Sequence, residues 1–262
     1  MRPPVLRASG VSVSYGGVRA LASVDLEVRE GQLVGLIGPN GAGKTTLIDA
    51  ISGLVPYSGG VELDGREVSS LPAHARARLG LTRTWQSIEL FDDLTIRENL
   101  AVASYRPSAW AAVRELLSKP FADTGAIDAA LELLGLESLA GTMPADLSQA
   151  QRKLVGVARA LAAEPRLVCL DEPAAGLDTR ERKELGQRLR KLVDAGMTML
   201  LVDHDMGLVL GISDHVVVLA FGKVIAQGSP GVVRRDPSVI SAYLGSAAAE
   251  VAQEVSGDGG EP

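Results

Sequence analysis

The chain has 262 residues, of which 46% are hydrophobic and 22% charged, with a mean hydropathy of +0.17. A chain of this length and composition can bury a sizeable core, which excludes disorder as its default state. The formal net charge of −6 and the sequence pI of 5.2 argue against a protein whose main partner is nucleic acid.

Two hydrophobic patterns predict two kinds of strand. Apolar and polar residues alternate in the first part of the chain, as in half-buried antiparallel strands. The apolar members are Val11, Val13, Tyr15, Val24, Leu26, Val28, Val61 and Leu63. Continuous apolar runs, each followed by a turn or a helix, are instead typical of central strands in a parallel sheet. These runs cover residues 33–37, 167–170, 199–202 and 216–219. The fold class is therefore α/β, with a mixed sheet core and an antiparallel β subdomain.

A glycine-rich loop follows the first continuous run and leads into residues at helical spacing. Its members are Gly38, Asn40, Gly41, Ala42, Gly43, Lys44, Thr45 and Thr46. The glycines let successive N–H groups turn around the β- and γ-phosphates of a nucleotide, Lys44 adds a cation, and the Thr45 hydroxyl can ligate Mg²⁺. A Gly/Pro-rich turn alone explains the glycines but not Lys-Thr at that offset. The loop is a Walker A motif and predicts binding of ATP with Mg²⁺.

Helical patterns replace the strand signals between about Thr95 and Ala163. Thr95 and Glu98 form a capping box that opens a helix. Two further helical faces are apolar, one made of Ile127, Ala130, Leu131 and Leu134, the other of Leu154, Val157, Ala158 and Leu161. We expect one domain over residues 1–245, with its core at 1–86 and 164–245 and an α-helical lobe inserted at about 87–163. The acidic tail at 246–262 is expected to be flexible.

The apolar run at 167–170 ends in two carboxylates, Asp171 and Glu172. At the end of a strand beside a phosphate loop, Asp171 could hold the hydration shell of Mg²⁺, and Glu172 could orient or deprotonate an attacking water. The plainer interpretation is an acidic turn, which the upstream loop disfavours. Cys169, the only cysteine, lies in the same run, which favours a small buried side chain over a reactive thiol.

These motifs together resemble the ATP-binding subunits of ABC transporters, from about Leu6 to Leu244. The resemblance implies a P-loop NTPase of ABC type and gives roles to four more residues. Tyr15 corresponds to the aromatic that stacks on adenine, although an ordinary strand aromatic is the alternative. Gln86 corresponds to the Q-loop glutamine, which contacts Mg²⁺ or the attacking water. His204 corresponds to the switch histidine at the γ-phosphate, and Asp178 to the interface aspartate of the D-loop, or more simply to a helix N-cap.

The tract Leu147-Ser148-Gln149-Ala150-Gln151 departs from the Leu-Ser-Gly-Gly-Gln signature of this superfamily. In such transporters the tract closes over the nucleotide held by the partner subunit. Ser148 and Gln151 match the signature. Gln149 and Ala150 add a Cβ where backbone N–H groups approach phosphate, and the tract also satisfies a plain capping box. Phosphate contact through this tract is therefore an open question, and unequal activity of the two composite sites is one hypothesis.

Segments 171–177, 204–214 and 236–245 resemble the branched-chain amino-acid (LIV-type) import subunits more specifically, as does 85–100. That family implies an importer with a second ATPase subunit, two membrane-spanning permease subunits and an extracytoplasmic substrate-binding protein. No stretch of the chain approaches the roughly 20 apolar residues of a membrane span. We therefore expect a peripheral position on the cytoplasmic face of the plasma membrane, with Leu90 and Phe91 near the contact to the permease. Packing within the helical lobe is the alternative for these two apolar residues.

Two alternatives stand beside the importer subunit. The altered signature suggests an ATP-binding regulatory subunit with weak hydrolysis, against which Glu172 argues. A soluble ABC ATPase acting on DNA or ribosomes would usually carry a coiled-coil insertion or tandem P-loops and a basic surface, which this sequence lacks. Branched-chain amino acids and other small polar solutes stay open as the transported substrate.

Overall fold

In the computed structural model, which describes residues 4–84, 89–104 and 124–244, a six-stranded sheet forms the centre of the chain. Its order is β10-β9-β3-β8-β7-β6, with β3, β6, β7, β8 and β9 parallel and β10 antiparallel to β9. The strands are β3 (Leu33–Ile37), β6 (Leu81–Arg83), β7 (Leu167–Asp171), β8 (Met199–Val202), β9 (His215–Ala220) and β10 (Lys223–Gly228). Every residue of β3, β7 and β8 is buried. The predicted central parallel strands are therefore confirmed. They are buried because helices and a second sheet cover both faces of the sheet.

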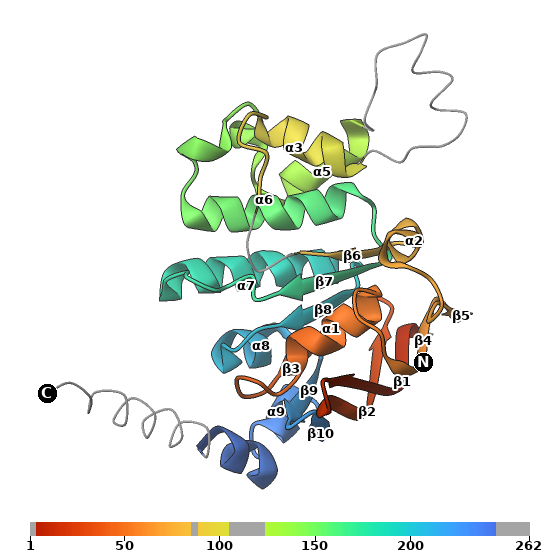
Figure 1. Ribbon diagram of the computed structural model, residues 1–262. Coiled ribbons are helices and arrows are strands. Elements are labelled where there is room, and N and C mark those ends of the chain that lie inside the picture. Colours follow the sequence, from red (N-terminus) through yellow and green to blue (C-terminus); the bar gives the residue numbers. More distant parts are fainter. Residues whose placement is uncertain (1–3, 85–88, 105–123, 245–262) are drawn as a thin grey trace, which may run out of the picture.

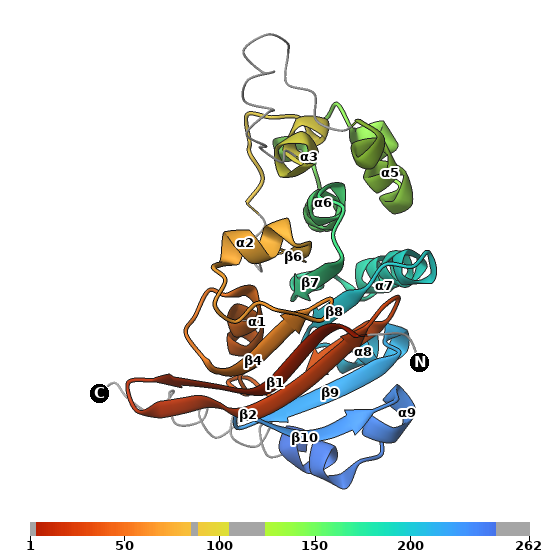
Figure 2. The same cartoon turned by 90° about the vertical axis from the view of Figure 1, so that its right-hand side faces the viewer.

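A four-stranded antiparallel sheet of order β2-β1-β4-β5 packs against one face of this centre. Its strands are β1 (Pro4–Tyr15), β2 (Val18–Arg29), β4 (Ser58–Leu63) and β5 (Arg66–Glu67). The long β1 and β2 run side by side in Figure 2, with α1 (Lys44–Ser52) lying between the two sheets. Leu47, Ile48 and Ile51 of α1 are buried there with alternate residues of both sheets. The predicted antiparallel subdomain is thus present.

The opposite face is covered by α7 (Thr179–Asp194) and α8 (Met206–Ile212). Leu185, Leu189 and Leu192 of α7 are buried against that face, as their helical spacing predicts. Two shorter helices complete this part of the chain, α2 (Ala73–Arg78) between β5 and β6, and α9 (Pro230–Val233) after β10.

The helical lobe consists of α3 (Ile96–Ser104), α5 (Thr124–Leu134) and α6 (Gln149–Ala162), with 3-10 turns at Glu137–Leu139 and Pro144–Asp146. Figure 1 shows it stacked beyond the β6 and β7 side of the sheet. The predicted Thr95 and Glu98 capping box opens α3. On α6, Val157, Ala158 and Leu161 are buried as predicted, whereas Leu154 is only half-buried and its neighbour Val155 is fully buried instead.

None of the helices among the described residues is long and apolar enough to cross a membrane. The bounds proposed for core and lobe stay a prediction, and the tail at 246–262 lies outside the described residues.

Cys169 lies in the middle of β7 with no exposed surface, so the expectation of a small buried side chain is confirmed. Burial raises the pKa of its thiol to about 12, because a thiolate would lose its hydration there. We expect Cys169 to react with iodoacetamide at pH 8.5 at least ~100-fold more slowly in the folded chain than in urea, because the thiolate is the nucleophile. Mass spectrometry of labelled protein measures the two rates, and comparable rates would contradict the buried position.

Candidate nucleotide site

The glycine-rich loop joins the end of β3 to the start of α1. Gly38 has a positive φ of 155°, and a Cβ at this position would collide with the carbonyl oxygen of Leu219 at the end of β9. Gly43 is the N-cap of α1 with φ 104°, and a Cβ there would lie 2.8 Å from the carbonyl oxygen of Ala20. Glycine is therefore required at both ends of the loop. No side chain caps the start of α1, so its first N–H groups can serve an anion.

Lys44 begins α1, and its side chain turns back into the loop. Its ammonium donates to the carbonyl oxygens of Gly38 at 2.7 Å and Pro39 at 3.0 Å. Burial lowers the pKa of Lys44, while the charges of Glu172, Asp171 and Asp203 oppose that change. The loop thus holds a cation beside uncapped helix amides, an arrangement suited to phosphate. On the loop Asn40 is exposed and Ala42 is buried, and in the first turn of α1 Thr45 is exposed and Thr46 half-buried.

The carboxylates predicted at the end of β7 lie beside the end of β8. Asp171 is buried, and the next residue, Glu172, donates its N–H to the carbonyl of Val202 at 2.8 Å. Glu172 has φ 48°, a left-handed backbone that a non-glycine residue adopts only under local constraint. His204 follows β8, with its Nδ1 3.8 Å from Glu172 Oε2 and 3.6 Å from Asp203 Oδ1. The fold therefore brings Glu172 and His204 together.

Arg83, to which the sequence analysis gives no role, holds this cluster from β6. Its guanidinium donates to Asp171 Oδ2 at 2.8 Å and also to Asp49 of α1, with a side chain that is 8% exposed. Burial alone would lower the pKa of Arg83, but the hydrogen bonds to Asp49 and Asp171 raise it. No local pattern in the sequence singles out Arg83. Nothing local identified its two acidic partners, which come from α1 and β7.

Three further predicted site residues come from other parts of the chain. Tyr15 ends β1 beside a turn and is 49% exposed, which is compatible both with a face open to an adenine and with an ordinary strand aromatic. Asp178 caps α7 through a capping box with Glu181, which confirms its N-cap interpretation. Gln86 lies outside the described residues.

The signature tract opens α6, where Ser148 and Gln151 form the reciprocal capping box that their spacing predicts. The side chain of Gln149 lies over Gly176, since a Cβ on Gly176 would collide with Gln149 Nε2. The tract therefore contacts the segment that leads to Asp178 in the same chain. Gly176 has φ 76°, so glycine suits this position in backbone conformation as well as space.

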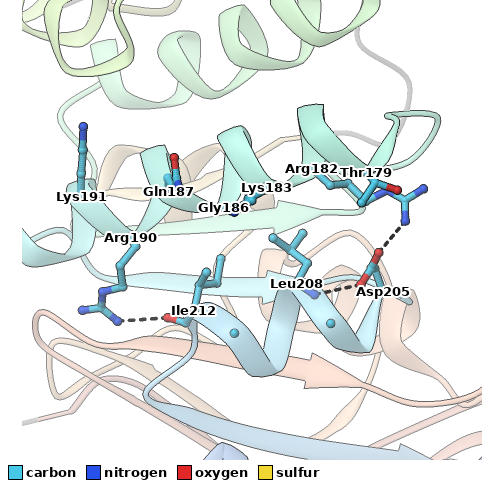
Figure 3. A pocket seen from close by; sticks show the side chains of 12 residues that line it. Thr179, Arg182, Lys183, Gly186, Gln187, Arg190, Lys191, Asp205, Leu208 and Ile212 are labelled. Atoms are coloured by element: carbon cyan, nitrogen blue, oxygen red, sulfur yellow. Dashed lines mark hydrogen bonds and ion pairs between the residues drawn. The ribbon is translucent and has the colours of Figure 1, made fainter.

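A hollow of about 600 Å³ between α7 and α8 has no phosphate-loop residue in its lining. Figure 3 shows Arg182 paired with Asp205 at one end and Arg190 bonded to the carbonyl of Ile212 at the other, with Leu208 facing Gly186 between them. A second hollow of about 630 Å³ lies where β6 and residues 89–91 meet α6. Its lining includes Thr84, Phe91 and Arg159.

The fold and the loop define a P-loop nucleotide-binding cassette. Residues 21–175 match the family model described as ABC transporter, and residues 223–249 match that of the branched-chain amino acid ATP-binding cassette transporter. Two similar proteins are the high-affinity branched-chain amino acid transport ATP-binding proteins BraF of Pseudomonas aeruginosa and LivG of Escherichia coli K12. They are 40% and 38% identical to this chain, each over 94% of it and 100% of the relative. The lipopolysaccharide export system ATP-binding protein LptB of E. coli K12 is 36% identical over 92% of the chain and 97% of its own length.

Solved structures agree. The ADP conformation of MJ1267, an ATP-binding cassette of an ABC transporter, matches with a TM-score of 0.80 and 28% identity over 93% of this chain and 99% of that one. A nucleotide-free cassette from an ABC transporter matches equally well, with a TM-score of 0.80 over 92% of this chain and 99% of that one. The chain belongs to the ABC transporter ATP-binding family, in its branched-chain amino acid group. It is an ATPase, and membership of the family implies nucleotide binding, a dimer of ATPase subunits and permease partners at a membrane.

Arg83→Met should lower the free energy of unfolding by about 3 kcal/mol, because Asp171 and Asp49 lose a buried partner. Arg97→Met removes an arginine whose pair with Asp128 is exposed, and should cost less than about 1 kcal/mol. Urea unfolding followed by circular dichroism measures both. Equal losses in the two variants would mean that Arg83 does not hold the cluster.

Proposed function

We propose that this chain binds MgATP at the 38–46 loop and hydrolyses it with Glu172 and His204, as the ATPase subunit of an importer. The observation that carries the proposal is the meeting of three strand ends at one edge of the sheet. The loop after β3 brings Lys44, the end of β7 brings Asp171 and Glu172, and the turn after β8 brings His204. A turn or an isolated acidic loop would not require this convergence.

The residues present fit Mg²⁺, which binds through a few oxygen donors together with substrate phosphates. Thr45 offers a hydroxyl in the first turn of α1, and Asp171 offers a carboxylate at the end of β7. When bound, Mg²⁺ neutralises charge on the β- and γ-phosphates. Gln86 is proposed as a further ligand or water contact on the ground of the family pattern.

In the proposed mechanism Lys44 and the loop amides bind the phosphates and stabilise charge on the transferring phosphoryl group. The negative charges of Glu172, Asp171 and Asp203 act on the Lys44 ammonium. The Glu172 carboxylate orients the attacking water and accepts its proton. His204, whose Nδ1 is 3.8 Å from Glu172 Oε2, contacts the γ-phosphate. Tyr15, exposed at the end of β1, would stack on the adenine.

A second ATPase subunit completes the site in this proposal. Ser148 and Gln151 at the start of α6, together with Asp178 at the start of α7, would face the partner's nucleotide. The contact of Gln149 with Gly176 supports this, because it places the signature tract beside the segment that carries Asp178. A regulatory subunit that only binds ATP would not need Glu172 poised next to His204.

The proposed cargo is a branched-chain amino acid, on the ground of the relatives' names and the match of residues 223–249. The assembly would hold two membrane-spanning permease subunits and take its solute from an extracytoplasmic binding protein. The chain would sit on the cytoplasmic face of the plasma membrane through those permeases. Purification of the tagged chain from mild detergent should recover polytopic membrane proteins and a second ATPase, and uptake of labelled leucine should need the chain.

Glu172→Gln should lower the rate of phosphate release at least ~100-fold, because it removes the proposed general base. MgATP binding, measured by calorimetry, should persist. Glu184→Gln on the exposed face of α7 is the matched control and should hydrolyse ATP at the normal rate. Unchanged hydrolysis in Glu172→Gln would reject this catalytic assignment.

The hollow beside residues 89–91 suits the proposed contact with the permease. Asn99 is fully buried and shapes this segment by bonding both the N–H and the carbonyl of Phe91, as well as the carbonyl of Leu94. Phe91 is exposed next to the guanidinium of Arg159, which lies 5.6 Å from its ring centre. Leu90, by contrast, is buried in the core of the lobe, so lobe packing accounts for it.

Phe91→Ala should therefore reduce solute uptake at least ~10-fold while MgATP binding and the unfolding free energy stay near their normal values. Leu90→Ala should instead cost about 2–4 kcal/mol of stability, because it opens a cavity in the lobe. Uptake in whole cells and urea unfolding of the purified chain separate the two effects. Normal uptake in Phe91→Ala would remove this surface from the permease contact.

A further inference from the structure

A second buried lysine faces the catalytic cluster. Lys153 belongs to α6, the helix that the signature tract opens, and its residue is only 8% exposed. Its ammonium lies 3.5 Å from the carbonyl oxygen of Glu172. Burial lowers the pKa of Lys153, and the charges of Asp203 and Glu172 oppose that change. A lysine is rarely buried to this extent without paired charges, so the contact with this cluster explains its position.

The groups that Lys153 faces are themselves tied together. Asp203 is fully buried and accepts the N–H of Ala174 at 3.2 Å and the N–H of Asp205 at 3.0 Å. It therefore joins the turn after Glu172 to the turn that carries His204. Lys153 adds the helical lobe to this network, since its Nζ bonds the backbone of Glu172 and its charge interacts with Asp203.

The backbone of Glu172 needs such support. Its φ of 48° is a left-handed conformation that a residue with a Cβ adopts only when its surroundings hold it there. The N–H of Glu172 is held by Val202 of β8 on one side, and its carbonyl faces Lys153 of α6 on the other. The direction of the Glu172 carboxylate therefore depends on both contacts.

We propose that Lys153 is a positioning residue that holds Glu172 in its catalytic orientation and links that orientation to the helical lobe. The inference rests on the proposed role of Glu172 in hydrolysis. Lys153 lies on the first turns of a helix whose N-cap is Ser148. A shift of α6 on docking of its signature tract against a partner's nucleotide would move the ammonium and with it the Glu172 turn. Closure at one site would in this way adjust the glutamate of the other.

The test uses the full chain in the transporter complex with which we expect it to copurify, and compares Lys153→Met, Lys153→Gln and Lys153→Arg. Methionine and glutamine keep much of the length of the lysine side chain without its charge, whereas arginine keeps the positive charge. We expect kcat for ATP hydrolysis to fall at least ~10-fold in Lys153→Met and Lys153→Gln, while KM stays within about threefold of the normal value. Lys153→Arg should keep a large part of the normal kcat. Lys183→Met, on an exposed position of α7, is the matched control and should leave kcat unchanged.

A purely structural lysine would behave differently. In that case Lys153→Gln and Lys153→Arg would lose activity in proportion to their loss of folded protein, which urea unfolding measures, and the kcat per folded molecule would stay normal. That result overturns the proposal. A normal kcat in Lys153→Met and Lys153→Gln also overturns it, as does a rise of KM as large as the expected fall of kcat. If Lys153→Met does not fold, kcat is compared between Lys153→Arg and Lys153→Gln alone, and the proposal requires the higher value in Lys153→Arg.

Glu172→Gln in the same complex separates this inference from the proposed function. If Glu172→Gln hydrolyses ATP normally, the assignment of Glu172 fails and the role of Lys153 fails with it. If Glu172→Gln is inactive while Lys153→Gln is normal, only the positioning role of Lys153 is overturned.

Discussion

The parallel pairing of β3, β8 and β7 is the constraint on which the rest of this structure depends. Parallel strands end at the same edge of a sheet, so the segments that follow them meet there. In this chain those segments are the 38–44 loop, the Asp171–Glu172 turn and the Asp203–His204 turn, although about 130 and 30 residues separate them along the chain. The strands can pair in this way because both of their faces are buried, which their continuous apolar runs make possible.

Burial of charge is the second constraint. Asp171, Asp203, Lys44 and Lys153 are all buried, and the Arg83 guanidinium pairs with Asp171. An isolated buried charge is costly, so these groups hold their positions only as a set. The set draws on α1, β6, α6, β7 and the turn after β8. The contacts of these buried charges therefore connect the helical lobe to the ends of the central strands.

The signature tract caps a helix and also packs against a distant segment of the same chain. Ser148 and Gln151 cap α6 within the chain, as any Ser-x-x-Gln can. Gln149 replaces a glycine of the superfamily pattern, and its side chain covers Gly176 instead of extending freely. The capping box was predictable from spacing alone. The contact with Gly176 was not, since 27 residues separate the two positions and only packing brings them together.

The sequence by itself determined the fold class, the glycine-rich loop before α1 and the ends of the strands that lead to Asp171 and His204, because these depend on local spacing: apolar runs, glycines and capping residues. The same local reasoning found the N-cap role of Asp178 but could not choose between packing and contact for Leu90 and Phe91. Only the tertiary structure decided that Leu90 is buried and Phe91 exposed, that Arg83 holds Asp171 and Asp49, and that Lys153 faces Glu172. The physical reason is that side-chain burial and charge pairing depend on neighbours from distant segments, which spacing along one segment does not specify.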